Sequence, residues 1–301
     1  MNMLCEGRVV IVTGGARGIG REYSLMLAAH GAKVVVNDLG GAPDGSSPDA
    51  TPAQVVANEI KSNGGEAIAN GEDISNWAAA KRMVQQAIDT FGKLDVVINN
   101  AGILRDRMFV NMSEQEFDDV IRVHLKGTFA PSHHAAQYWR DLSKSTGKPV
   151  KARIINTTSN SGIYGNAGQT NYGAAKMGIA AFTIIASQEL ARYGITVNAI
   201  SPIAETRLTA GLRERTPEQI VQRHPRWIAP VVTWLASERS SDVTGRIFET
   251  GGGVLAVAEG WVRGPEAAPR EKPDAELEKL LLSLVSKARK NSSAFTGKPQ
   301  D

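Results

Sequence analysis

The sequence has little cysteine: Cys5 is the only one among 301 residues, so no disulfide can form within the chain. This scarcity is typical of a reducing compartment. The sequence also lacks an apolar run of about eighteen residues, the length that crosses a bilayer as a helix. Its N-terminus shows neither the apolar core nor the cleavage site of a signal peptide. We therefore expect a cytoplasmic protein with no membrane partner.

Metal and nucleic-acid partners are disfavoured by similar absences. The five histidines show no metal-ligand spacing with acids or with the cysteine. The 34 basic and 31 acidic residues are interspersed, and the formal net charge is only +3. The basic run "KARK" near the C-terminus fits the last turn of a solvated helix, and no nucleic-acid-binding motif accompanies it. We expect no metal site and no nucleic-acid partner.

Short β-branched runs alternate with longer helical patterns along the chain. Almost continuously apolar runs, typical of strands covered on both faces, occupy residues 8–12, 33–38, 94–100, 152–157 and 195–200, with weaker candidates near Glu66 and Arg246. Helical patterns occupy residues 19–30, 53–63, 77–91, 114–142, 172–193 and 227–237. This alternation predicts an α/β fold: a doubly wound, Rossmann-type parallel sheet of seven strands with helices on both faces.

Two loop-like segments interrupt this rhythm. Residues 39–52 are rich in Gly, Pro, Asp and Ser, and residues 264–273 are rich in Pro. A helix with a leucine stripe is expected over residues 274–289. We expect a main domain over residues 1–263 and a C-terminal extension over residues 264–301. The leucine stripe would pack against the body or against a second subunit.

A glycine-rich stretch, "TGGARGIG" from Thr13 to Gly20, follows the first predicted strand and opens the first helix. Gly14, Gly18 and Gly20 lack the Cβ atoms that would keep backbone N–H groups away from a pyrophosphate at the helix N-terminus. Plain turns use similar glycines, but the strand–loop–helix context favours dinucleotide binding.

Asp38 ends the second predicted strand, roughly 20 residues past the glycine loop, where a carboxylate can bind the ribose 2′-hydroxyl. Its charge would repel a 2′-phosphate and so favours NAD over NADP. Arg17, within the glycine loop, argues for NADP, but no basic residue directly follows Asp38. A capping or turn role for Asp38 is the alternative.

Two further segments fit a nucleotide site at the same edge of the sheet. Asp73 follows the third predicted strand and can hydrogen-bond the adenine amino group, although capping the next helix fits its position equally well. The tetrad "NNAG", residues 99–102, ends the fourth strand, where the backbone must leave the sheet beside a flat ligand. In isolation it could be a simple turn.

The stretch "NTTSNSGIYGNAGQTNYGAAK", residues 156–176, contains no acid and no histidine. Tyr172 and Lys176 are four residues apart and share one face of a helix, while Ser159 lies at the end of a predicted strand. A tyrosine hydroxyl, with a pKa near 10, is a poor base at neutral pH. We expect a nearby ammonium group and a positive nicotinamide ring to lower that pKa, so that Tyr172 exchanges protons with substrate.

In the same scheme Ser159 hydrogen-bonds the substrate oxygen, and Lys176 also reaches the nicotinamide ribose. Taken singly, the three residues fit a turn, a helix-surface aromatic and a solvated charge. Their occurrence together, in this order along a βαβ chain, favours the catalytic interpretation.

These motifs resemble the short-chain dehydrogenases/reductases over roughly residues 7–253. Longer stretches, "VVVNDLGG", "NNAGILRDRMF", "VHLKGTF" and "SGIYGNAGQTNYGAAK", are similar to one subgroup. That subgroup is the (3R)-hydroxyacyl-CoA dehydrogenase part of peroxisomal multifunctional enzyme type 2, also known as a 17β-hydroxysteroid dehydrogenase, together with bacterial relatives.

The resemblance implies an NAD(P)-dependent oxidoreductase, with NAD preferred, that interconverts a secondary alcohol and a ketone. The implied substrate is a (3R)-hydroxyacyl-CoA or a steroid-derived hydroxy compound; the alternatives are another small carbonyl or polyol and a non-catalytic NAD-binding sensor. It also implies a homodimer or homotetramer that uses the helices at 114–142 and 172–193. No hydratase or carrier segment and no peroxisomal "SKL" end follow, so we expect a stand-alone dehydrogenase.

The site residues that the resemblance implies fall into two sets. The catalytic set is Ser159, Tyr172, Lys176 and His124, and His124 stands where the wider family usually has an asparagine whose carbonyl helps hold a water beside the lysine. The cofactor set is Thr13, Gly14, Arg17, Gly18, Ile19, Gly20, Asp38, Asp73, Ile74, Asn100, Ala101, Gly102, Tyr172, Lys176 and Thr206.

Three further positions bear on ligand binding. Pro202-Ile203 replaces the family's usual Pro-Gly pair, although Thr206 and Thr209 still follow it. Arg105 and Arg107 come after the "NNAG" turn, where one of them could meet a CoA phosphate. A solvated surface role fits both arginines as well.

Overall fold

The computed structural model describes residues 3–40, 51–205, 216–269, 273 and 275–300. One sheet runs through this part of the chain in the order β3-β2-β1-β4-β5-β6-β7-β8. Its parallel strands are β1 (Val9–Thr13), β2 (Lys33–Asn37), β3 (Glu66–Asn70), β4 (Val96–Asn99), β5 (Ala152–Thr157), β6 (Ile195–Pro202) and β7 (Ile247–Gly251). The predicted doubly wound parallel sheet is confirmed, with one strand more than expected.

The additional strand is β8 (Val254–Val257), which pairs antiparallel with β7 at the edge of the sheet. All four of its residues are exposed, so no buried-strand pattern marks it in the sequence. It follows a turn in which Gly251, Gly252 and Gly253 all have positive φ, between 59° and 101°. Only glycine adopts three such angles in succession at low cost, and this turn is what brings β8 back onto β7.

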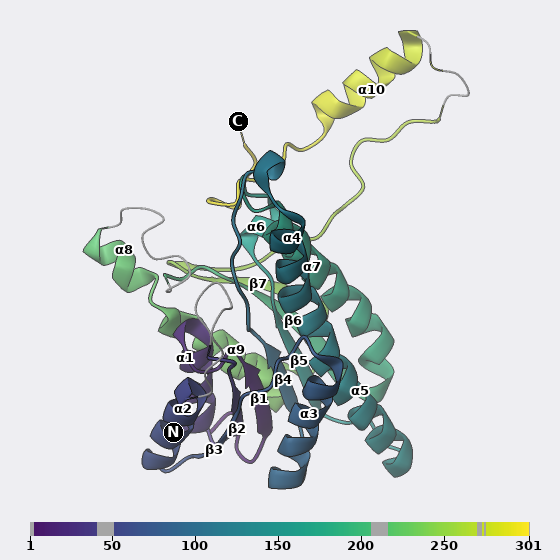
Figure 1. Cartoon of the computed structure of the whole chain (residues 1–301). Coiled ribbons are helices and arrows are strands. Elements are labelled where there is room, and N and C mark those ends of the chain that lie inside the picture. The colour runs from purple at the N-terminus through teal and green to yellow at the C-terminus, as the bar shows by residue number, and fades with distance from the viewer. Residues whose placement is uncertain (1–2, 41–50, 206–215, 270–272, 274, 301) are drawn as a thin grey trace.

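Alternate residues of the central strands enter separate cores on the two faces of the sheet. Figure 1 shows the helices that lie on either side of the sheet. Val10 and Val12 pack with α1 (Gly18–Ala29), α2 (Thr51–Ser62) and α9 (Ala229–Ala236). Val9 and Ile11 pack with α3 (Trp77–Phe91), α5 (Gly127–Thr146) and α7 (Thr170–Leu190). Coverage on both faces explains why the strands are apolar throughout instead of alternating.

The helix expected over residues 114–142 is interrupted. α4 (Glu114–Ile121) leads into a π-helical segment (Arg122–Lys126), and α5 continues the path from Gly127. A π-helical turn accommodates an extra residue, which changes the direction of the side chains after it. The apolar periodicity of the sequence does not reveal this break, which places His124 in the interior.

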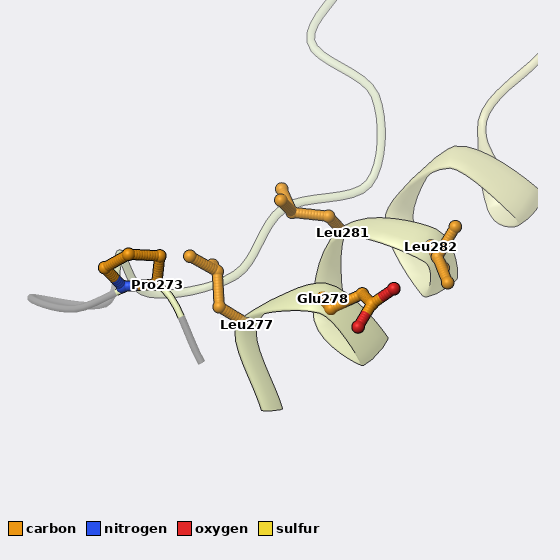
Figure 2. A pocket seen from close by; sticks show the side chains of 5 residues that line it. All are labelled: Pro273, Leu277, Glu278, Leu281 and Leu282. Carbon is orange, nitrogen blue, oxygen red and sulfur yellow. The ribbon is translucent and has the colours of Figure 1, made fainter. Parts of the chain in front are cut away.

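The remaining helices and turns complete the described part of the chain. They are α6 (Asn160–Ile163), α8 (Pro217–Gln222), α10 (Ala275–Lys287) and 3₁₀ turns at Phe109–Asn111, Ala191–Tyr193, Pro225–Trp227 and Glu238–Ser240. α10 stands out from the body (Figure 1). Pro273 and α10 residues line a hollow of about 430 Å³, drawn in Figure 2. None of the described helices is both long enough and apolar enough to traverse a bilayer.

Candidate active site

The glycine loop after β1 is shaped by close backbone contacts. Gly14 and Gly18 have positive φ angles of 61° and 49°, which favour glycine. A Cβ on Gly20 would lie 2.0 Å from the carbonyl oxygen of Gly14, so the loop also requires glycine there. No side chain caps α1, and its first turn contains no acid. The N–H groups of this turn therefore fit an anionic pyrophosphate, the group that the sequence predicts here.

Thr13 and Asn100 join the ends of β1 and β4 beneath this loop. The Thr13 hydroxyl accepts the N–H groups of Asn100 and Ala101 at 2.9 and 3.2 Å. The Asn100 side chain donates to the carbonyl oxygens of Thr13 and Gly14, both at 3.1 Å. Both side chains are thus engaged with backbone, so they shape the loop. The sequence indicated these positions, but not that the asparagine side chain holds the glycine loop.

Asp38 lies directly beside the glycine loop. One carboxylate oxygen accepts the N–H of Ala16 at 3.1 Å, and the other accepts the N–H of Gly40 at 2.8 Å. The turn role that we left open is therefore present. It keeps the charge next to the loop, where a carboxylate suits a ribose hydroxyl. Arg17 is the residue immediately before α1.

Asp73 is held in a turn before α3. Its Oδ1 accepts the N–H and the hydroxyl of Ser75 at 2.8 and 2.7 Å, and Arg122 lies 3.4 Å from Oδ2. The residue that caps α3 is Asn76, so the helix-capping alternative for Asp73 is wrong. Ile74, the next residue of the predicted cofactor set, follows Asp73 and is buried, with 6% of its surface exposed.

Ser159, Tyr172 and Lys176 meet where β5, α6 and α7 converge. Ser159 is the N-cap residue of α6, and its side chain hydrogen-bonds that of Tyr172. The Lys176 amine donates to the carbonyl oxygen of Thr157 at 2.6 Å and lies 5.5 Å from the centre of the Tyr172 ring. The structure thus brings the predicted trio together. Gly162 allows α6 to approach α7 closely, because a Cβ on this residue would lie 2.7 Å from the Cβ of Lys176.

Burial controls the electrostatics of the trio. It raises the pKa of Tyr172 to about 12, with a further increase from Asp106, while the hydrogen bond with Ser159 acts in the opposite direction. Burial also lowers the pKa of Lys176 to about 7. Our expectation that a neighbouring ammonium lowers the tyrosine pKa is therefore wrong for the protein's own groups. Desolvation is the largest influence on the pKa of the phenol, and it reduces the charge on the lysine as well.

His124 lies in the π-helical segment, with 3% of its surface exposed. Its Nε2 is 2.8 Å from the carbonyl oxygen of Ile103, and its ring meets the Tyr172 ring edge-on at 5.1 Å. Burial, helped by Lys176, lowers its pKa to about 3, so the ring is neutral at physiological pH. A Cβ on Gly102 would lie 2.2 Å from the imidazole, so this glycine admits the ring.

The arginines after the "NNAG" turn have different surroundings. Arg107 pairs with Glu116 at 3.0 Å, within the cap of α4. The guanidinium of half-buried Arg105 makes no hydrogen bond or ion pair with any residue that the structure describes.

Thr206 and Thr209 lie outside the described residues. Ile203, in place of the family's glycine, packs against Gly252.

Comparison with known proteins gives consistent matches. The family model described as "short chain dehydrogenase" matches residues 8–217. The chain is 43% identical over 252 residues to a hydroxyacyl-CoA dehydrogenase of Mycobacterium tuberculosis, covering 81% of this chain and 77% of that protein. It is 43% identical over 268 residues to peroxisomal multifunctional enzyme type 2 of Mus musculus, and this match covers 89% of this chain and 34% of that protein. A solved structure of a short chain dehydrogenase from Mycobacterium avium matches with a TM-score of 0.86 at 49% identity. The match covers 96% of this chain and 98% of that one.

These matches confirm the predicted likeness to short-chain dehydrogenases and to the multifunctional enzymes. The chain spans 27% to 53% of the length of the longer peroxisomal relatives that it matches. The domain boundary at residue 263, the homo-oligomer and the cytoplasmic location stay predictions.

The lowered pKa of Lys176 generates a pH-dependent stability. Between about pH 7 and the ordinary value of 10.5, the unfolded chain holds a proton on this amine that the folded chain has lost. The free energy of unfolding must then rise with pH across that window, by up to about 1.4 kcal/mol per pH unit. Lys176→Met removes this titration. Denaturant unfolding of the cofactor-free proteins from pH 6 to pH 10 should show the wild type gaining stability relative to the variant, and parallel curves would contradict the prediction.

Proposed function

The chain belongs to the short-chain dehydrogenase/reductase family, and from that premise we propose that it is an NAD-dependent (3R)-hydroxyacyl-CoA dehydrogenase. The observation that carries the proposal is the convergence of Ser159, Tyr172 and Lys176 at the carboxyl edge of the sheet that also carries the glycine loop. In open α/β sheets, ligands bind at this edge. When bound, the dinucleotide supplies the hydride acceptor and a positive charge.

We assign roles to the chain's own residues on the basis of this geometry. The Ser159 hydroxyl binds and orients the substrate oxygen. Tyr172 then transfers a proton at that oxygen. With a pKa of about 12 its hydroxyl stays protonated and can donate during ketone reduction, whereas alcohol oxidation requires the same hydroxyl to be deprotonated. Lys176, whose pKa is about 7, exchanges protons near neutrality. Neutral His124 supports the Tyr172 ring edge-on, without adding charge beside it.

The relatives support the substrate class. The Mycobacterium tuberculosis relative, of which the match covers 77%, is named a hydroxyacyl-CoA dehydrogenase. The guanidinium of half-buried Arg105 has no hydrogen-bond or ion-pair partner among the described residues, so it is available for a CoA phosphate. Arg107 is already paired with Glu116, which makes it the weaker candidate. A steroid-derived hydroxy compound, a small carbonyl and a polyol remain substrates to be compared in the assay.

The first test of the proposal is Tyr172→Phe, with Tyr193→Phe as a tyrosine control outside the site. Loss of the proton donor should lower kcat for (3R)-hydroxyacyl-CoA oxidation by about 10³-fold, within the range of general acid–base catalysis. NAD reduction is assayed with (3R)- and (3S)-hydroxyacyl-CoAs, 17β-hydroxysteroids and polyols, and NAD affinity is measured separately. Near wild-type turnover by Tyr172→Phe would refute the assignment. NAD binding with no turnover of any compound would favour the sensor instead.

NAD preference is tested with Asp38→Asn. Removing the carboxylate charge should weaken NAD use and relieve the repulsion of a 2′-phosphate. A charged hydrogen bond is worth about 1.5–3 kcal/mol, so the ratio of kcat/KM for NAD to that for NADP should fall about ten- to hundredfold. Asp73→Asn is the control, because an adenine contact affects both cofactors alike. An unchanged ratio in Asp38→Asn would assign cofactor preference elsewhere.

The CoA contact is tested with Arg105→Ala against Arg107→Ala. If Arg105 binds a CoA phosphate, its loss should raise KM for the acyl-CoA about tenfold, the value of one charged hydrogen bond. KM for an acyl-pantetheine that lacks the nucleotide should not change. Inhibition by free CoA should weaken in parallel. An unchanged KM for the acyl-CoA in Arg105→Ala would remove this contact from the proposal.

A further inference from the structure

Ser159 is carried by a very short helix. It is the N-cap residue of α6, which has only four residues, and Tyr164 is the C-cap. The Ser159 hydroxyl accepts the N–H of Ser161 at 3.2 Å. One helical turn is not stable by itself, because nucleation fixes several residues in return for few hydrogen bonds. Contacts from outside α6 must therefore set its position, and with it the position of the Ser159 hydroxyl.

Two neighbouring residues of β6 and β7 provide such contacts. Ser201 and Glu249 are partners in the parallel register of these strands. The Ser201 hydroxyl donates to the side-chain oxygen of Asn160, the first residue of α6, at 2.5 Å. The Tyr164 hydroxyl donates to the Glu249 carboxylate. One register pair of the sheet therefore holds both ends of α6, and we call these two hydrogen bonds the α6 clamp.

The two sheet residues of the α6 clamp are buried. Ser201 is fully buried and Glu249 is 7% exposed, while their partners Asn160 and Tyr164 are half-buried, so loss of either hydrogen bond leaves a buried polar group on the sheet without this partner. Burial and the Glu249 carboxylate both raise the pKa of Tyr164, so it remains a hydrogen-bond donor. The C-terminal segment returns to this place (Figure 1): Asn160 donates to the carbonyl oxygen of Ala294 at 3.4 Å. Gly297 lies beside Tyr164 and Glu249.

We propose that Ser201 and Glu249 are positioning residues that hold α6 through Asn160 and Tyr164 and thereby direct the Ser159 hydroxyl toward the substrate oxygen. The inference rests on the proposed function of Ser159. Neither positioning residue needs to touch the substrate. If one end of α6 is released, Ser159 is displaced from Tyr172, and a displacement of about 1 Å at a reacting centre can cost up to about a hundredfold in rate.

The test compares three variants of the full chain. Tyr164→Phe and Glu249→Ala each remove the same hydrogen bond and should lower kcat about tenfold or more, with NAD affinity unchanged. Glu249→Gln keeps an acceptor of the same shape and should recover most of what Glu249→Ala loses. Amide hydrogen exchange of residues 159–164 should accelerate in Tyr164→Phe, while exchange of the glycine loop stays the same.

A double-mutant cycle separates positioning from a general structural role. If the α6 clamp acts through Ser159, Tyr164→Phe should cause little further loss of kcat in a Ser159→Ala background. Equal losses in both backgrounds, or wild-type kcat in Tyr164→Phe, would overturn the inference. Failure of the proposed function gives a different result: either the wild type turns over none of the compounds, or Ser159→Ala and Tyr172→Phe both retain turnover.

Discussion

The hydrogen bond from the Lys176 amine to the carbonyl oxygen of Thr157 is the contact on which the site depends. It ties α7 to the last residue of β5, and the Thr158 hydroxyl adds a second bond to the backbone of Lys176 at 2.6 Å. Since Tyr172 lies one turn earlier on α7, this attachment also directs its ring toward Ser159 and His124. The amine is buried at this position, and desolvation lowers its pKa to about 7.

Desolvation, more than charge pairing, sets the proton affinities of this site. It holds Tyr172 protonated, reduces the charge on Lys176 and keeps His124 neutral. A site without a strong internal charge is suited to a cofactor that brings its own positive ring, because that charge acts on the buried phenol with little screening. The glycine loop offers backbone N–H groups at the start of α1, and the Asp38 carboxylate accepts one N–H of the same loop.

Several parts of the fold and site could be predicted from the sequence because their causes are local. Apolar runs mark the parallel strands, the glycines between Gly14 and Gly20 mark a tight strand-to-helix turn, and a spacing of four places Tyr172 and Lys176 on one helix face. The distance along the chain from Asp38 to the same loop predicted that its carboxylate lies beside the loop, where the structure places it. The family match agrees with these predictions, since it covers residues 8–217.

The remaining features are decided by contacts between residues far apart in the chain, which no local pattern records. The π-helical segment places His124 where only a glycine at position 102 leaves room for it. The register of β6 and β7 places Glu249 against Tyr164, although 85 residues separate them. Among the protein's own groups, burial likewise raises the pKa of Tyr172, which no local pattern predicts because desolvation depends on the whole fold. The sequence by itself determined which chemical groups are present and which helix or strand carries each one. Only the tertiary structure decided how deeply they are buried and which distant side chains hold them in place.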